Sequence, residues 1–293
     1  MNLESYLKKC QREVDRALRG FLPSGSAMPP TIHKAMRHSV FAGGKRLRPV
    51  LCLAAAEAVG ARAGNALAHA CALECIHTYS LIHDDLPCMD DDDFRRGKPT
   101  CHKVYGEAVA VLAGDALQAM AFEILAGAAG SARYPVAALV RELAVTSGSR
   151  KLIAGQVLDL EGEGALLGVR ELKRIHQNKT AALLATSVRL GAMSANVTPR
   201  VLAALTEFGT ALGLAFQVID DILDVTQSSE RLGKSAGKDV AAQKATYPST
   251  IGLEASRREA ARLTRRAEKA LAIFGKKGAR LREISAYLLE RDY

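Results

Sequence analysis

Two groups of aspartates stand far apart in the chain, and their concentration beside apolar residues is the pattern most indicative of chemistry. The first group runs from Asp84 to Asp93 and the second from Asp220 to Asp224. Two like charges about 4 Å apart repel one another by ~1 kcal/mol in water and by ~4 kcal/mol at the effective dielectric near a protein surface. Because such repulsion opposes folding, we expect each group to bind something positively charged.

The second group has helical spacing. Asp220 and Asp224 are four residues apart, so a helix places them on one face, one turn from each other. Gln217, three residues before Asp220, shares that face. The apolar residues between these positions favour such a helix, and we expect the two carboxylates and the amide to act together.

A helix is also expected to carry the start of the first group. Beginning near residue 66, it brings His77, Ser80 and Asp84 onto one face. Pro87 helps to end this helix, because proline lacks the N–H group that a helix interior needs. The chain can then curl back and return Asp90 to the neighbourhood of Asp84.

The ligand chemistry indicates magnesium. Carboxylate oxygens without histidine or cysteine select hard cations, and Mg²⁺ is usually held by one or two carboxylates together with water and substrate phosphate. The predicted cofactor is therefore Mg²⁺, and the substrate is expected to carry phosphate groups.

Basic residues in two glycine-containing segments could hold those phosphates. One segment is Gly43-Gly44-Lys45-Arg46-Leu47-Arg48-Pro49, and the other, Arg95-Arg96-Gly97-Lys98, follows the first acidic group directly. Arginine matches phosphate oxygens with parallel N–H donors, whereas lysine acts as a point charge. The lysines considered for this role are Lys45, Lys179, Lys234 and Lys244. Acidic groups for metal and separate basic groups could together hold two diphosphates.

These residues are expected to stand on helices. The 293-residue chain is 48% apolar and 5% aromatic and lacks tryptophan, and its apolar residues recur at three- and four-residue spacing rather than in alternation. Abundant alanine and leucine favour helix over strand. Glycines and prolines divide the sequence into roughly ten to twelve helical segments. No long polar linker separates two cores, so we expect one all-α domain over residues 1–293.

Composition also bears on location and partners. The N-terminus lacks the apolar stretch of a signal peptide, and Asp115 and Glu123 interrupt the most apolar later stretch, so no membrane span is predicted. The six cysteines fit reduced thiols, which indicates a cytoplasmic protein. The net charge is +9, and residues 231–293 hold 15 basic against 7 acidic residues. Their helical alternation with apolar residues favours a solvated helix face over nucleic-acid or anionic-membrane binding.

Several motifs together resemble a known family. The stretches GGKRLRP, SLIHDDLPCMDDDDFRRGKPTCH, the Lys179-Thr180 pair, FQVIDDILDV and LGKSAGKD are similar, in order and spacing, to the short-chain trans-isoprenyl diphosphate synthases, in particular the bacterial farnesyl diphosphate synthases. The resemblance spans nearly the whole chain. It implies an all-α fold whose helices surround a deep central cavity, and a homodimer.

The resemblance also implies roles for single residues. Three magnesium ions, which Mn²⁺ could replace, would be held against the diphosphate of an allylic substrate by Asp84, Asp85, Asp90, Asp220 and Asp224. The allylic diphosphate, dimethylallyl or geranyl, would be contacted by Arg95, Lys179, Thr180, Gln217, Lys234 and Lys244. Isopentenyl diphosphate would be held by Lys45, Arg48, His77 and Arg96.

The implied activity is head-to-tail prenyl transfer. Metal and basic residues stabilise the negative charge on the departing diphosphate. The allylic carbocation would be flanked by the Lys179 carbonyl, Thr180 and Gln217, and the double bond of isopentenyl diphosphate attacks it. Loss of a proton, to the released diphosphate, restores an alkene. No side-chain nucleophile is required; His77 is expected to contact phosphate and His83 to be a packed neighbour.

Product length is expected to depend on the helix that leads to Asp84. Ser80, one turn before Asp84, is small and leaves room for a growing chain. Tyr79, five residues before Asp84, could close the cavity about 7.5 Å along the helix axis. An aromatic residue there, with the Pro87-Cys88 pair, resembles the farnesyl synthases more than the geranylgeranyl synthases. The alternative is that Tyr79 is ordinary core.

Other functions stay open. A geranylgeranyl or geranyl diphosphate synthase has the same motifs, whereas a noncatalytic partner subunit of a prenyl synthase usually lacks one of the aspartate motifs. A terpene cyclase would not need the GGKRLRP segment. The glycine-containing segment Lys234 to Lys244 has the composition of a lid, and closure of the site by the C-terminal Arg291-Asp292-Tyr293 is a further open question.

Overall fold

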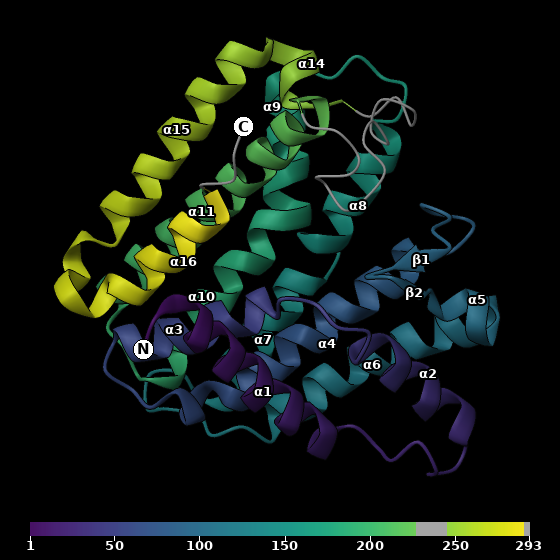
Figure 1. Cartoon of the computed structure of the whole chain (residues 1–293). Helices are drawn as coiled ribbons and strands as arrows, with labels where there is room; N and C mark the ends of the chain where they lie inside the picture. Colours follow the sequence, from purple (N-terminus) through teal and green to yellow (C-terminus); the bar gives the residue numbers. More distant parts are fainter. Residues whose placement is uncertain (227–244, 290–293) are drawn as a thin grey trace.

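A computed structural model describes residues 1–226 and 245–289 (Figure 1). The α-helices are α1 (Leu3–Phe21), α2 (Pro30–Val40), α3 (Leu47–Ala58), α4 (Leu67–Asp84), α5 (Cys101–Tyr105), α6 (Glu107–Ala126), α7 (Val136–Ser147), α8 (Leu152–Glu161), α9 (Val169–His176), α10 (Ala182–Ser194), α11 (Pro199–Thr226), α14 (Tyr247–Ile251), α15 (Leu253–Ala270) and α16 (Ala279–Leu289). Short 3-10 turns η1 (Ala63–Ala66) and η3 (Ala272–Gly278), and the π-helical turn η2 (Gln177–Ala181), connect some of them. The expected all-α fold is confirmed.

One small hairpin interrupts the helices. The strands β1 (Phe94–Arg95) and β2 (Lys98–Pro99) pair in antiparallel register, with Phe94 opposite Pro99. Their turn places Arg96 and Gly97 at positive φ. The hairpin lies beyond the C-terminal end of α4 (Figure 1), so it directs the basic residues that follow the first acidic group.

The outer helix α1 shows how local sequence sets the elements. Asn2 is the N-cap of this helix. Its side-chain oxygen accepts a hydrogen bond of 2.9 Å from the Ser5 N–H and so satisfies a donor at the helix start. Its buried residues, Tyr6, Cys10, Val14 and Leu18, recur every fourth position. Such a stripe covers the core on one face and leaves charged residues on the other.

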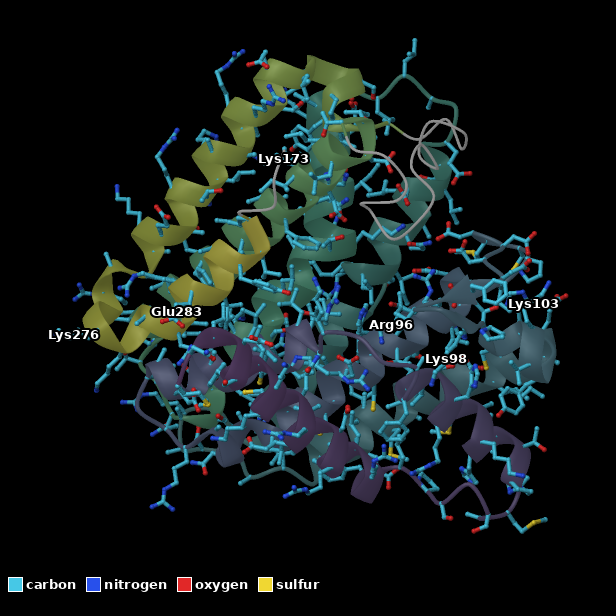
Figure 2. All side chains as sticks on the ribbon, viewed as in Figure 1. Arg96, Lys98, Lys103, Lys173, Lys276 and Glu283 are labelled. Atoms are coloured by element: carbon cyan, nitrogen blue, oxygen red, sulfur yellow. The ribbon has the colours of Figure 1, made fainter. Side chains whose placement is uncertain are left out.

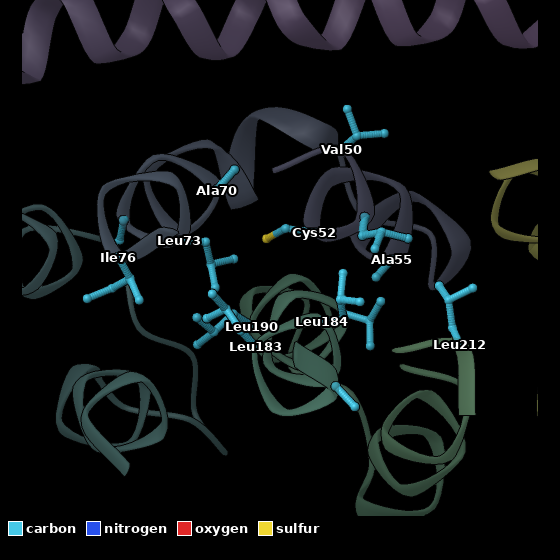
Figure 3. Packing of buried hydrophobic residues seen from close by; sticks show 14 of the residues in the cluster. Val50, Cys52, Ala55, Ala70, Leu73, Ile76, Leu183, Leu184, Leu190 and Leu212 are labelled. Atoms are coloured by element: carbon cyan, nitrogen blue, oxygen red, sulfur yellow. The ribbon is translucent and has the colours of Figure 1, made fainter. Parts of the chain in front are cut away.

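The core lies between α3, α4, α10 and α11. Figure 3 shows Cys52 and Ala55 of α3, Leu73 of α4 and Leu184 of α10 meeting in one interior. Glycine lets these helices approach closely, because a Cβ on Gly191 would lie 2.0 Å from the Cys52 carbonyl oxygen. The same cluster of buried side chains includes residues from α1 through α16.

Two helices, α6 and α11, are long and apolar enough by length and composition to cross a membrane. The most apolar window of α11 is 61% buried inside the protein and that of α6 is 39% buried. The core helices of a globular fold meet the same criteria, so the observation is weak evidence for a span.

Candidate active site

A cavity of about 670 Å³ lies beside the C-terminal half of α4. Its walls come from α4, α6, α8, η2 and the start of α10, and its volume is in the range of small-molecule sites. Seven residues predicted from the sequence line it: Arg48, His77, Tyr79, Ser80, Asp84, Lys179 and Thr180. The helix face expected to carry His77, Ser80 and Asp84 therefore faces one cavity.

The first acidic segment, residues 84–93, turns back on the end of α4. The helix ends at Asp84, and the N–H of Asp90 donates a hydrogen bond of 2.8 Å to the Asp84 carbonyl oxygen. Asp91 adopts a positive φ of 47° in this turn. The curl expected from the sequence is thus present, and it brings Asp90 beside the end of the helix.

Charges at this turn are only partly compensated. Burial raises the pKa of Asp84 to about 6, an effect that Asp90 and Asp85 strengthen and Lys179 and Arg95 oppose. Burial likewise raises the pKa of Asp85, although Arg95 donates a hydrogen bond of 2.5 Å to it. A cation bound here would relieve the cost of ionising Asp84.

The second acidic segment lies on α11, where neighbouring aspartates have different surroundings. Asp224 is 6% exposed, and its Oδ2 is buried without a hydrogen-bond partner among the described residues. Asp221 is also buried, but it accepts hydrogen bonds from the Tyr247 N–H at 2.9 Å and from Gln217 Nε2 at 3.3 Å. The helix face predicted from the sequence includes Gln217, Asp220 and Asp224 but not Asp221, and no signal in the sequence identifies its partner Tyr247.

The donor set fits magnesium. Within residues 1–226 and 245–289, no three His, Cys, Asp or Glu side chains are close enough to hold a metal by themselves. Mg²⁺ does not need such a cage, because it takes one or two carboxylates and completes its shell with water and phosphate oxygens. The unpartnered Asp224 oxygen and the buried Asp84 carboxyl are donors of this kind.

The Lys179-Thr180 pair lies in the π-helical turn η2, a distortion common at functional sites. Lys179 Nζ lies 2.6 Å from Asp159 Oδ2 on α8, and Thr180 donates a hydrogen bond of 3.0 Å to Gln217 Oε1 on α11. A Cβ on Gly155 would lie 2.2 Å from the Lys179 nitrogen, so glycine allows α8 to approach η2. Sequence reasoning missed Asp159, because its partner is 20 residues away on another element.

A second group of charges, called here the arginine cluster, consists of Arg48, Arg96 and His77. Burial lowers the pKa of His77 well below 6.5, and nearby Arg48 and Arg96 lower it further. Burial and Arg96 also lower the pKa of Arg48 to about 10, although Glu74 opposes them. The Nε of Arg48 is buried and has no hydrogen-bond partner in the part of the chain that the structure describes. The cluster therefore has positive charge and donors available for an anion.

Glycine positions Arg96, which comes from the β1–β2 turn (Figure 2). Its guanidinium donates a hydrogen bond to the Gly43 carbonyl. A Cβ on Gly44 would lie 2.4 Å from the Arg96 guanidinium carbon, and Gly44 has a φ of +113°. The positive φ requires glycine here, and the absence of a side chain leaves room for the Arg96 guanidinium.

The three basic residues of the GGKRLRP segment have different surroundings. Arg46 is buried and pairs with Glu74 at 2.8 Å and with Asp15 at 2.9 Å. The Lys45 ammonium lies 5.3 Å from the centroid of the Tyr287 ring on α16. Of the three, only Arg48 lines the cavity.

The remaining predicted site residues divide into two groups. Asp85, Asp90, Arg95, Arg96, Gln217, Asp220 and Asp224 do not line the cavity itself; the first four stand on the turn and hairpin after α4, and the last three on α11. Lys234 and Lys244, with the lid expected between them, lie outside the described residues, as does the C-terminal Arg291-Asp292-Tyr293.

Both residues assigned to product length face the cavity. Tyr79 is 6% exposed and donates a hydrogen bond of 3.4 Å to the Ser147 carbonyl on α7. Ser80 donates to the His77 carbonyl at 2.9 Å, as helix serines often do. His83, the expected packed neighbour, lies 3.0 Å from the Val111 carbonyl oxygen.

Known proteins resemble this chain over nearly its full length. A family model described as polyprenyl synthetase matches residues 29–284. The chloroplastic geranylgeranyl pyrophosphate synthase of Capsicum annuum is 54% identical over 90% of this chain and 72% of its own. An FPP/GFPP synthase from Zymomonas mobilis has a TM-score of 0.86 and 36% identity, covering 98% of this chain and 99% of that one.

A third relative was solved with ligands. The geranyltransferase of Helicobacter pylori, complexed with magnesium and isoprenyl diphosphate, has a TM-score of 0.83 and 34% identity, covering 98% of this chain and 96% of that one. These matches confirm the predicted resemblance at the level of the family, while the relatives' names give different products. This chain belongs to the polyprenyl synthetase family and is a trans-prenyltransferase.

Proposed function

We propose that this protein is a farnesyl diphosphate synthase. It condenses dimethylallyl and then geranyl diphosphate with isopentenyl diphosphate, head to tail, to give (2E,6E)-farnesyl diphosphate. The observation that supports this product most directly is the buried Tyr79 side chain in the cavity wall, five residues before Asp84.

The charged groups near the cavity divide between the two substrates. Asp84, Asp85, Asp90, Asp220 and Asp224 would hold Mg²⁺, or Mn²⁺ in its place, against the allylic diphosphate, with three ions expected per site. Bound metal supplies positive charge that stabilises the departing diphosphate. The unpartnered Asp224 oxygen and the magnesium of the Helicobacter pylori relative support this assignment.

Basic groups of this chain assist the same departure. Lys179 and Arg95 both stabilise the ionised form of Asp84, which supports their assignment as contacts of a diphosphate held at the first acidic segment. Lys234 and Lys244 are proposed to act with them. The second substrate, isopentenyl diphosphate, is proposed to bind the arginine cluster, and Lys45 is proposed to assist.

Thr180 and Gln217 stand where positive charge would develop. Thr180 lines the cavity, and its hydroxyl is hydrogen-bonded to Gln217. With the Lys179 carbonyl, these dipoles stabilise an allylic cation without bonding to it. Attack by the isopentenyl double bond and transfer of the released proton to diphosphate complete the reaction.

The competing product is geranylgeranyl diphosphate, which the name of the 54% identical Capsicum annuum relative favours. A cavity that accepts twenty carbons needs space beyond Tyr79. The tyrosine hydroxyl is tied to α7 through Ser147, which holds the ring in place. This restraint favours fifteen carbons over twenty, and the small Ser80 favours fifteen over ten.

Product sizing tests the assignment. Purified protein with Mg²⁺, dimethylallyl diphosphate and isopentenyl diphosphate is expected to give fifteen-carbon product after phosphatase treatment and chromatography. Tyr79→Ala is expected to extend the main product to twenty carbons or more, and Ser80→Phe to shorten it to ten. Val157→Ala, which enlarges the cavity from α8, serves as a control for cavity enlargement away from α4. A twenty-carbon product from the unaltered protein would refute the farnesyl assignment.

Assembly and location are part of the proposal. A homodimer is proposed, because α6 exposes apolar side chains such as Leu112, which is 57% exposed, along a helix with few charges. A cytoplasmic location is proposed from the composition, and all six cysteines are free thiols.

A further inference from the structure

A chain of polar contacts runs behind the cavity from η2 to α14. The Thr180 hydroxyl donates to Gln217 Oε1 at 3.0 Å, and Gln217 Nε2 donates to Asp221 Oδ1 at 3.3 Å. The other carboxylate oxygen, Asp221 Oδ2, accepts from the Tyr247 N–H at 2.9 Å. The chain joins a residue that lines the cavity to a buried acid that does not line it.

The direction of every donor in this chain follows from Asp221. An ionised carboxylate can only accept hydrogen bonds, so Gln217 must turn its NH₂ group toward Asp221 and its carbonyl oxygen toward Thr180. The carbonyl oxygen can only accept, so Thr180 must donate its single hydroxyl proton to Gln217. Because its proton is used in this bond, the Thr180 hydroxyl can present only oxygen lone pairs to the cavity.

We propose that Asp221 is a positioning residue that fixes the polarity of the Thr180–Gln217 pair, so that Thr180 presents oxygen rather than a proton to the allylic cation. An oxygen dipole stabilises positive charge, whereas a proton in its place opposes it. This inference rests on the proposed prenyl-transfer mechanism and is independent of product length.

Two simpler roles for Asp221 explain less. As a metal ligand it would have to share its oxygens, because each already accepts a hydrogen bond from the protein, whereas Asp224 has an oxygen without a partner among the described residues. As a cap for α14 it would need only Oδ2, and Thr246 already caps that helix through Ser249. The ring of His176 lies 3.9 Å from Asp221, but burial lowers its pKa to about 4, so it is neutral and does not discharge the carboxylate.

The first test is Asp221→Asn. The introduced amide keeps an oxygen for the Tyr247 N–H, but its NH₂ group now faces Gln217 and needs an acceptor. The Gln217 amide must turn over, and Thr180 must then accept and direct its proton elsewhere. We expect kcat to fall about 30-fold, while KM and the Mg²⁺ concentration for half-maximal rate change less than about threefold and the melting temperature by only a few degrees.

The second test exchanges the acid and the amide. In Asp221→Asn combined with Gln217→Glu, the introduced glutamate accepts from both neighbours, so Thr180 again donates and the net charge is that of the unaltered protein. We expect kcat of the double variant to return to within about threefold of the unaltered enzyme. Neither single variant is expected to do so.

A third variant links the effect to the hydroxyl. In a Thr180→Val background no proton can point the wrong way, so adding Asp221→Asn is expected to lower kcat by less than about threefold. Glu254→Gln is the control for loss of one carboxylate, because Glu254 forms an exposed ion pair with Arg257 on α15. It is expected to retain full activity.

The outcomes separate the possibilities. A double variant no faster than Asp221→Asn overturns the inference, as does a loss that high Mg²⁺ restores, which would make Asp221 a metal ligand. A large fall in melting temperature with an unchanged kcat also overturns it and leaves only the cap. If the unaltered protein forms no prenyl product, the proposed function fails instead.

Discussion

The acidic segments and the arginine cluster are unbalanced in opposite directions. On the acidic side, burial raises the pKa of Asp84 and leaves an Asp224 oxygen without a partner among the described residues. In the arginine cluster, burial and neighbouring arginines lower the pKa of His77 and Arg48. The acidic segments lack the positive charge that bound magnesium supplies. The arginine cluster lacks the negative charge that a diphosphate supplies.

Arg46, in the same basic segment as Arg48, behaves differently. It pairs with two carboxylates, Glu74 and Asp15. The contrast indicates that Arg46 holds the fold, whereas the buried charges without such partners are available to ligands. Substitutions at one residue of each kind test this division.

The largest effect is expected at the acidic segments. Asp84→Asn and Asp224→Asn are each expected to lower kcat about 10³-fold or more, because the charge on the departing diphosphate is then poorly neutralised. Steady-state rates at saturating substrate measure this. Asp93→Asn is the matched control, since Asp93 is exposed and pairs with Lys103 at the surface. Losses below tenfold at both sites would remove these residues from the catalytic group.

Arg46 provides the next largest effect, on stability. Arg46→Met leaves Glu74 buried without its cation and is expected to lower the free energy of unfolding by ~3–5 kcal/mol. Urea denaturation measures the change. Lys8→Met, which removes an exposed ion pair with Glu4, is expected to cost no more than about 0.5 kcal/mol. Equal effects from the two variants would contradict a structural role for Arg46.

A smaller effect is expected within the arginine cluster. Arg48→Met is expected to raise KM for isopentenyl diphosphate about 30-fold, because a desolvated guanidinium with an open donor is lost, with little change in melting temperature. Lys45→Met is expected to raise it by less than about fivefold, since Lys45 stacks on Tyr287 and does not line the cavity. The reverse order would show that substrate draws Lys45 into the site.

Much of the fold and part of the site were predictable from local sequence. Helical periodicity identified the helices, and the proline after the Asp84-Asp85 pair correctly indicated the turn that returns Asp90 to α4. These features depend on residues close together in the chain, where spacing determines which side chains share a face.

The missed features depend on contacts between distant elements. Arg46 points inward because it pairs with Glu74, which lies 28 residues away on α4. Nothing in the GGKRLRP segment indicates this partner. Asp159 meets Lys179 on η2, and Asp221 meets Tyr247 on α14, across elements far apart in the chain. Spacing predicts which residues share a face but not which groups meet across a fold.

Binding of one ligand tests most directly whether the two acidic segments act together. A nonhydrolysable geranyl diphosphate analogue is titrated calorimetrically, with Mg²⁺ or with chelator, into the unaltered protein, Asp84→Asn, Asp224→Asn and the double variant. We expect Mg²⁺ to tighten binding at least about 100-fold in the unaltered protein, each single variant to lose most of that gain, and the double variant to lose little more. Binding that is indifferent to Mg²⁺, or losses that simply add, would contradict a shared magnesium diphosphate site.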